Sequence, residues 1–185
     1  MSLTVFEITL IALMIVILLS ILWSTLSLGI SPMPSSNKAR QAILNLCDEI
    51  KHESNDGPIY ELGSGWGHTL VALAKHYQQR PIIGYELSFL PWLVSVIWVK
   101  LLGLSHVRIY RQNFLKVDLS DACVIVCYLF SGGMEKLEHK FATQKHSVKY
   151  VISHHFALPS HQSIKTIELN DLYKTPVYLY RMNFN

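Results

Sequence analysis

The sequence predicts a doubly wound α/β domain whose sheet is mostly parallel and ends in an antiparallel last strand, preceded by one N-terminal transmembrane helix. Three observations support this fold class. Short apolar runs alternate with helical stretches from residue 58 to residue 153, which is typical of a parallel sheet with crossover helices. Two strand-like runs then follow each other directly, which favours an antiparallel finish. Finally, no charged residue occurs between Ile8 and Asn37.

The N-terminal apolar segment is long enough to cross a membrane. Ile8 to Ile30 comprises 23 residues without a charge, and a helix of that length extends about 35 Å. A cleaved signal peptide would show a basic region before a shorter apolar core, and a buried globular helix is seldom apolar on all sides. We therefore expect a retained anchor over 5–30, a Pro/Ser linker over 31–37 and a globular domain over 38–185.

The charges on either side of the anchor predict its orientation. Glu7 precedes the apolar segment, whereas Lys38, Arg40 and Lys51 follow it. The positive-inside rule then places the globular domain in the cytoplasm, so we expect a single-pass membrane protein, in the inner membrane if the cell is bacterial. The net charge of +3 is too small to indicate nucleic acid as a partner, and none is expected.

Within the domain, the periodicity of apolar residues predicts the order of helices and strands. Predicted helices cover 39–50, 66–77, 89–102 and 133–141, and Ser36 or Asn37 is expected to cap the first. Predicted strands cover 58–62, 81–86, 106–110, 122–129, 148–153, 164–169 and 177–181. The run over 122–129 is nearly all apolar, as expected for a strand covered on both faces.

The predicted helix over 89–102 lacks the polar outer stripe that a helix on a sheet normally carries. Lys100 is its only charged residue, and the helix is too short for a second membrane span. Its tryptophans and its lysine would suit a membrane interface. Alternatively, another part of the chain, such as the helix from Ala39, covers the outer face. The sequence leaves both possibilities open.

A glycine-rich loop, Glu-Leu-Gly-Ser-Gly-Trp-Gly over 61–67, follows the first predicted strand. Glycines allow a tight turn and a close approach to a ligand, and the next helix offers unpaired N–H groups at its start. The nicotinamide fingerprint does not fit, because its third glycine would fall on His68. A nucleophile elbow and a phosphate-binding P-loop are also absent from the loop.

An acidic residue, Glu86, ends the next predicted strand, 23 residues after Gly63. An acid at this position can accept hydrogen bonds from both hydroxyls of a ribose. The succession of strand, glycine loop, helix and strand-end acid resembles the cofactor-binding unit of class I, seven-β-strand methyltransferases, which share a Rossmann-like sheet. The resemblance implies S-adenosylmethionine as the cofactor and methyl transfer as the reaction.

Further segments extend the resemblance over nearly all of 59–181. They are 84–88, 91–93, 113–114, 118–122, 127–130, 156–159 and 171–181. Together they resemble a group of small, membrane-anchored bacterial methyltransferases that is similar to the mitochondrial membrane-anchored protein-lysine methyltransferases. The resemblance implies a membrane partner and a membrane-protein substrate, with a lysine amine as the expected acceptor.

The resemblance also implies a set of cofactor-binding residues. They are Glu61, Gly63, Ser64, Gly65, Gly67, Glu86, Asn113 and Phe114. The glycines would line the methionine part of the cofactor, and Glu61 would accept from its amino group. Asn113 stands where the class often has an Asp for the adenine amino group, which an Asn carbonyl can still accept from. Phe114 would flank the adenine or pack in the core.

Tyr128 ends the predicted strand over 122–129, where class I enzymes position the acceptor. We expect it to be the catalytic, substrate-positioning residue, with ordinary packing as the alternative. The surrounding Cys-Tyr-Leu-Phe differs from the Asn/Asp-Pro-Pro-Tyr of enzymes that methylate bases or glutamine, which counts against those substrates. His154, His155 and His161 have no acidic or cysteine partner at ligand spacing, so no metal is expected.

The leading hypothesis is therefore a membrane-anchored methyltransferase that uses S-adenosylmethionine. The alternative is a catalytically inactive cofactor-binding or scaffold protein of the membrane. Intact glycines and Glu86 favour cofactor binding in both cases, so only methyl transfer to a membrane extract distinguishes them.

Overall fold

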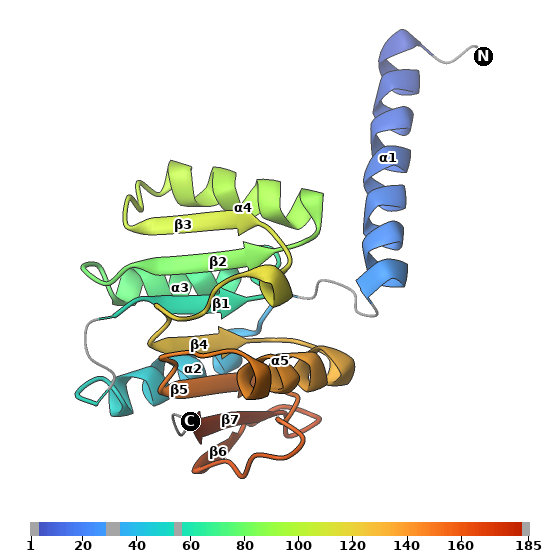
Figure 1. Cartoon of the computed structure of the whole chain (residues 1–185). Coiled ribbons are helices and arrows are strands. Elements are labelled where there is room, and N and C mark those ends of the chain that lie inside the picture. The colour runs from blue at the N-terminus through green and yellow to red at the C-terminus, as the bar shows by residue number, and fades with distance from the viewer. Residues whose placement is uncertain (1–3, 29–33, 54–56, 183–185) are drawn as a thin grey trace.

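The computed structural model describes residues 4–28, 34–53 and 57–182. Within these residues the chain forms a seven-stranded mixed sheet in the order β3-β2-β1-β4-β5-β7-β6 (Figure 1). The strands are β1 (Ile59–Leu62), β2 (Ile82–Glu86), β3 (Val107–Arg111), β4 (Val124–Cys127), β5 (Tyr150–His154), β6 (Lys165–Glu168) and β7 (Pro176–Arg181). The first five are parallel, and β7 is antiparallel to both β5 and β6. The predicted sheet with its antiparallel last strand is confirmed.

The strand order reverses direction at the centre of the sheet. β1 pairs with β2 on one side and with β4 on the other, whereas the chain passes from β2 to the edge strand β3 before it returns to β4. The loops that follow β1 and β4 therefore diverge, and they leave an opening at the carboxyl ends of these strands. Such a switch point is where open α/β sheets bind their ligands.

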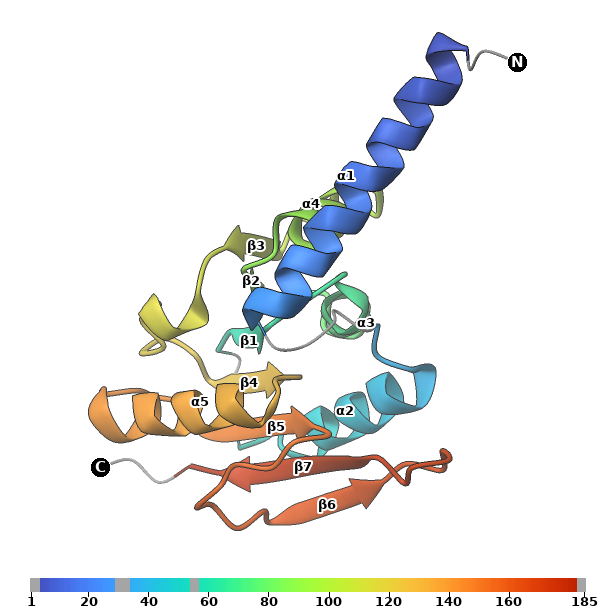
Figure 2. The same ribbon diagram turned by 90° about the vertical axis from the view of Figure 1, so that its right-hand side faces the viewer.

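Helices cover both faces of the sheet. On one face lie α2 (Asn37–Glu49), α3 (His68–His76) and α4 (Phe89–Leu101), and on the other lies α5 (Ser131–Thr143) (Figure 2). Two apolar clusters fill the layers between them: Ile43 and Leu70 belong to the first, and Ile125 and Leu137 to the second. This burial on both faces explains the nearly continuous apolar runs of the central strands.

Local chemistry sets several boundaries differently from the prediction. Ser36 caps α2, because its Oγ accepts a hydrogen bond from the N–H of Ala39 at 3.1 Å. The helix expected from residue 66 begins at His68, since Gly67 has a left-handed backbone with φ of 83°. The strand expected over 122–129 is shorter, since the chain leaves the sheet after Cys127 and α5 begins at Ser131. A short 3-10 helix, η1 (Phe114–Lys116), was not predicted.

The N-terminal helix α1 (Val5–Leu28) projects from the domain past α4, on the side away from β6 and β7 (Figures 1 and 2). It lies beside α4 over part of its length. Of the expected anchor over 5–30, residues 29–30 and the side chains at 13, 16 and 19–28 lie outside the described part. Counting only what the structure describes, no helix is both long and apolar enough to cross a membrane.

Candidate active site

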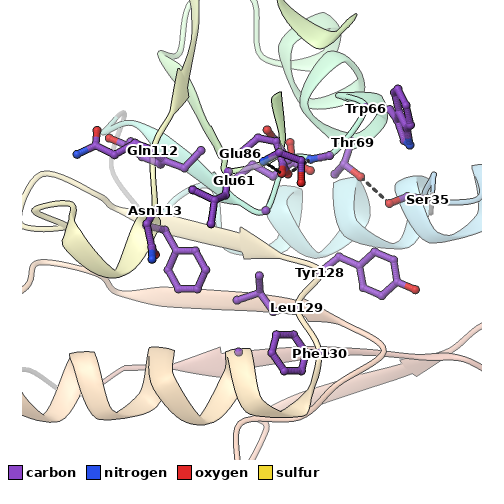
Figure 3. A pocket seen from close by; sticks show the side chains of 18 of the residues that line it. Ser35, Glu61, Trp66, Thr69, Glu86, Gln112, Asn113, Tyr128, Leu129 and Phe130 are labelled. Atoms are coloured by element: carbon purple, nitrogen blue, oxygen red, sulfur yellow. Dashed lines mark hydrogen bonds between the residues drawn. The ribbon is translucent and has the colours of Figure 1, made fainter. Parts of the chain in front are cut away.

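A pocket opens at the carboxyl ends of β1, β2 and β4. Its walls are the glycine loop, the ends of β1 and β2, residues 112–115 after β3 and residues 128–130 after β4. Glu61 and Glu86 lie together near its centre, with Asn113 toward one end and Tyr128 toward the other (Figure 3). The fold thus brings to one pocket every predicted site residue except Gly67, which does not line it.

The glycine loop is held against β2 by its own backbone. The N–H groups of Gly63 and Ser64 both donate to the carbonyl oxygen of Tyr85, at 2.9 and 3.0 Å. At Gly65, with φ of 53°, an added Cβ would meet no atom within 4 Å and would enter the pocket. At Gly67 an added Cβ would instead lie 2.8 Å from the Cβ of Ser95. Gly65 therefore keeps ligand space free, whereas Gly67 allows α3 and α4 to pack closely.

The buried Glu86 ties the loop to the start of α4. One carboxylate oxygen accepts from the N–H of Gly65 at 2.8 Å, and the other accepts from the N–H of Ser88 at 2.7 Å. Each carboxylate oxygen has a second acceptor site, so the group can still receive the hydroxyls of a ribose. Glu86 therefore has a structural task, the fixing of the loop, beside its expected ligand contact.

Glu61 is a buried acid without a full set of partners. It is 5% exposed, and its Oε2 has no hydrogen-bond partner among the described residues. Burial and the neighbouring Glu86 carboxylate raise the pKa of Glu61 well above its usual range, against the opposing effect of hydrogen bonds from Thr69 and Leu70. An unpartnered buried carboxyl oxygen in a pocket wall is suited to an ammonium group, which would supply the missing hydrogen bond and the compensating charge.

The far end of the pocket combines apolar side chains with one amide. Phe114 is half-buried and lines the pocket beside Leu115. The Oδ1 of Asn113 accepts from the N–H of Leu115 at 3.0 Å and so caps η1. Any contact of this carbonyl with an adenine amino group must therefore use its second acceptor site. Gln112 also lines the pocket and was not predicted, since no motif marks it.

The segment before α2 forms part of the wall near the glycine loop. Pro34 and Ser35 line the pocket, and the Oγ1 of Thr69 donates to the Oγ of Ser35 at 3.0 Å (Figure 3). Arg40 holds this segment through its hydrogen bond to the carbonyl oxygen of Ser35. No sequence motif signals this contact, because it joins a linker to the first turn of α3, 34 residues later.

The end near Tyr128 is aromatic. The Tyr128 ring is half-buried and lies 4.6 Å from the ring of His154, centroid to centroid. Burial, reinforced by the neighbouring His155, lowers the pKa of His154 to about 4, with a small opposing effect of Asp171. The imidazole is therefore neutral at physiological pH. Among the described residues, no group of His, Cys, Asp and Glu is arranged to hold a metal ion.

These features fit S-adenosylmethionine. Glu61 offers an acceptor for the ammonium of its methionine part, Glu86 for its ribose, and the apolar residues around Phe114 offer a surface for its adenine. The strand order, the glycine loop and the strand-end acid together define a class I methyltransferase that depends on S-adenosylmethionine. The ANTKMT methyltransferase domain matches residues 61–165, more than half of the chain, and the chain belongs to this family. The predicted activity and cofactor are confirmed.

Named relatives and solved structures agree with this class. A protein-lysine N-methyltransferase of Saccharolobus islandicus (strain REY15A) is 27% identical over 71% of this chain and 83% of that protein. A Mus musculus lysine N-methyltransferase that is named for a subunit of ATP synthase is 27% identical over 69% of this chain, which spans about half, 49%, of that protein. An RNA methyltransferase of Salinibacter ruber, solved with S-adenosyl-L-homocysteine, shares the fold with a TM-score of 0.65 at 21% identity, covering 80% of this chain and 93% of that chain.

Proposed function

We propose that this methyltransferase acts on a lysine amine of a protein at the surface of a membrane. The observation that carries the proposal is the aromatic end of the pocket, where Tyr128 lies on a neutral His154 close to the acids that fit the cofactor. Two relatives named as lysine methyltransferases support the same acceptor. An aromatic wall without added positive charge suits a long cationic side chain.

When bound, the cofactor supplies a methyl group that its sulfonium already activates. The task of the chain is then alignment, because an in-line attack needs the amine nitrogen and the methyl carbon held in one geometry. Glu61 and Glu86 would fix the cofactor, and Tyr128 would orient the amine at the end of β4. The lysine ammonium must lose a proton before its lone pair can attack, and a neutral His154 does not oppose the approach of the cation.

In this proposal α1 anchors the enzyme. The helix has 24 residues with Glu7 as its only charge, and that length extends about 36 Å. The apolar side chains described along it, among them Phe6, Leu10 and Leu18, are exposed. Lys38 and Arg40 follow it in the chain, which supports a cytoplasmic position of the domain over 38–185 and, in a bacterial cell, the inner membrane.

Methyl labelling tests the proposal. Membranes from cells with and without the protein would be incubated with the full chain and S-adenosylmethionine carrying a labelled methyl group, and labelled residues identified by mass spectrometry. We expect label on lysine of membrane proteins, in amounts greater than in the cytosolic fraction. Label confined to nucleic acid, small molecules or cytosolic proteins would contradict the proposal. Cofactor binding without any transfer would indicate the inactive alternative.

A further inference from the structure

The outer face of α4 is apolar and exposed. Phe89, Val94, Ile97 and Leu101 are all exposed, Leu101 to 81%, and Leu87 directly before the helix is exposed as well. We call these five residues the α4 face. The tryptophans of α4 do not belong to it. Trp92 donates to the carbonyl oxygen of Ile109 at 3.2 Å, and Trp98 packs edge-on against His68.

The described chain does not cover the α4 face. The helix α2, which the sequence left open as a cover, packs against α3, β5 and β7 on the same side of the sheet. The helix α1 does lie beside α4, yet the five side chains of the face remain exposed with α1 in place. Contiguous apolar side chains of this size at a surface indicate a contact with an apolar partner.

The surroundings of the α4 face carry positive charge only. Between Leu87 and Val117 the sequence contains no acidic residue, whereas Lys100, Arg108 and Arg111 are exposed. The guanidinium of Arg111 lies 5.3 Å from the centre of the Phe89 ring, so charge and apolar surface adjoin directly. Apolar side chains edged by basic ones match the acyl boundary and the headgroups of an anionic bilayer.

The position of α4 gives this surface a function. The projecting part of α1 extends past α4 on the same side of the domain (Figures 1 and 2). Leu87 belongs to the α4 face and also lines the cofactor pocket. We propose that the α4 face rests on an anionic phospholipid bilayer and holds the pocket mouth at the headgroup level. The proposal rests on the membrane anchor proposed above and adds a second, interfacial contact that fixes the orientation of the domain.

Lipid quenching in the full chain tests this contact. The native cysteines Cys47, Cys123 and Cys127 are buried, so a fluorophore can be attached to a single introduced cysteine. Leu101→Cys reports on the α4 face. Leu172→Cys is the matched control, because Leu172 is 89% exposed but lies between β6 and β7. A third variant, Ile11→Cys, reports on α1.

Each labelled protein is reconstituted into phosphatidylcholine vesicles, with or without phosphatidylglycerol, that contain lipids with a quencher on the acyl chain. We expect strong loss of fluorescence at positions 11 and 101, little at 172, and a greater loss at 101 when phosphatidylglycerol is present. Quenching at 11 without quenching at 101 would overturn the α4 contact and leave the anchor intact. Quenching at neither would overturn both.

A label at 101 that escapes lipid quenching and is also shielded from aqueous iodide would show that protein, such as a second copy, covers the face, and would equally overturn the proposal. Methyl transfer measured on the same vesicles separates these outcomes from a failure of the proposed activity, because none of the three positions lines the pocket. Reversal of charge by Arg108→Glu should remove the preference for phosphatidylglycerol at position 101 without changing quenching at 11. An unchanged preference would contradict the electrostatic part of the proposal.

Discussion

Replacement of Glu61 by Gln is expected to weaken cofactor binding and to change how stability depends on pH. Glu61 is buried, and its Oε2 lacks a partner among the described residues. Gln has nearly the same shape but no charge. If Glu61 accepts a hydrogen bond from the ammonium of S-adenosylmethionine, the variant loses one charge-assisted hydrogen bond, which contributes about 1.5–3 kcal/mol. The Kd should then rise about 10- to 150-fold.

The same substitution has a distinct effect on the protein without cofactor. Because burial and Glu86 raise the pKa of Glu61 above its ordinary value of 4.5, the folded chain holds this proton more tightly than the unfolded chain. The contribution of Glu61 to stability is therefore fully present below pH 4.5 and is lost as the pH rises through the raised pKa. Glu61→Gln removes this dependence, so the free energy of unfolding of wild type relative to the variant should fall as pH rises.

Two measurements check both effects. Calorimetric titration with S-adenosylmethionine across pH should show that wild-type affinity increases as Glu61 ionises, while the variant shows a flat, weaker binding. Urea unfolding at the same pH values, without cofactor, gives the stability difference. Equal Kd values for the two proteins would refute an ammonium contact at Glu61. A stability difference independent of pH would refute the raised pKa.

Three further substitutions test other parts of the site. Gly65→Ala and Gly103→Ala both place a Cβ in open space at positive φ, so each should cost about 1–2 kcal/mol of stability, but only Gly65→Ala should abolish calorimetric cofactor binding; equal binding by both would show that the loop does not cradle the ligand. Ser35→Ala should raise the Kd for the cofactor severalfold, whereas Ser36→Ala should cost about 1 kcal/mol of stability by loss of the α2 cap without changing the Kd, and the reverse pattern would exclude the linker as a pocket wall. Tyr128→Phe should lower kcat with an unchanged cofactor Kd, and an unchanged kcat would indicate that the tyrosine is merely packed.

The helix over 89–102 illustrates where sequence reasoning stops. Its length and its apolar composition were evident from the sequence, and α4 covers nearly the same residues. The sequence could not show which side chains face outward, and it favoured the tryptophans for a membrane interface. In the structure Trp92 and Trp98 contact the domain, whereas Phe89 and Leu101 are exposed. Only the packing of α4 against β3 and α3 decides this rotation about the helix axis.

The cofactor site divides in a similar way. The glycine loop and Glu86 were predictable because the turn needs positive φ at fixed positions and the acid must end the next strand. The wall made by Ser35, the second task of Glu86 and the distinct role of Gly67 were not, since each depends on a partner distant in sequence.

By itself, the sequence determined the alternation of strands and helices, the antiparallel last strand and the class of cofactor, because periodicity and turn chemistry act over neighbouring residues. The tertiary structure decided which acid lacks a partner, which residues close the pocket and which face of α4 is exposed. These properties depend on desolvation and on side-chain packing between segments that meet only when the sheet has formed, and no local pattern records them.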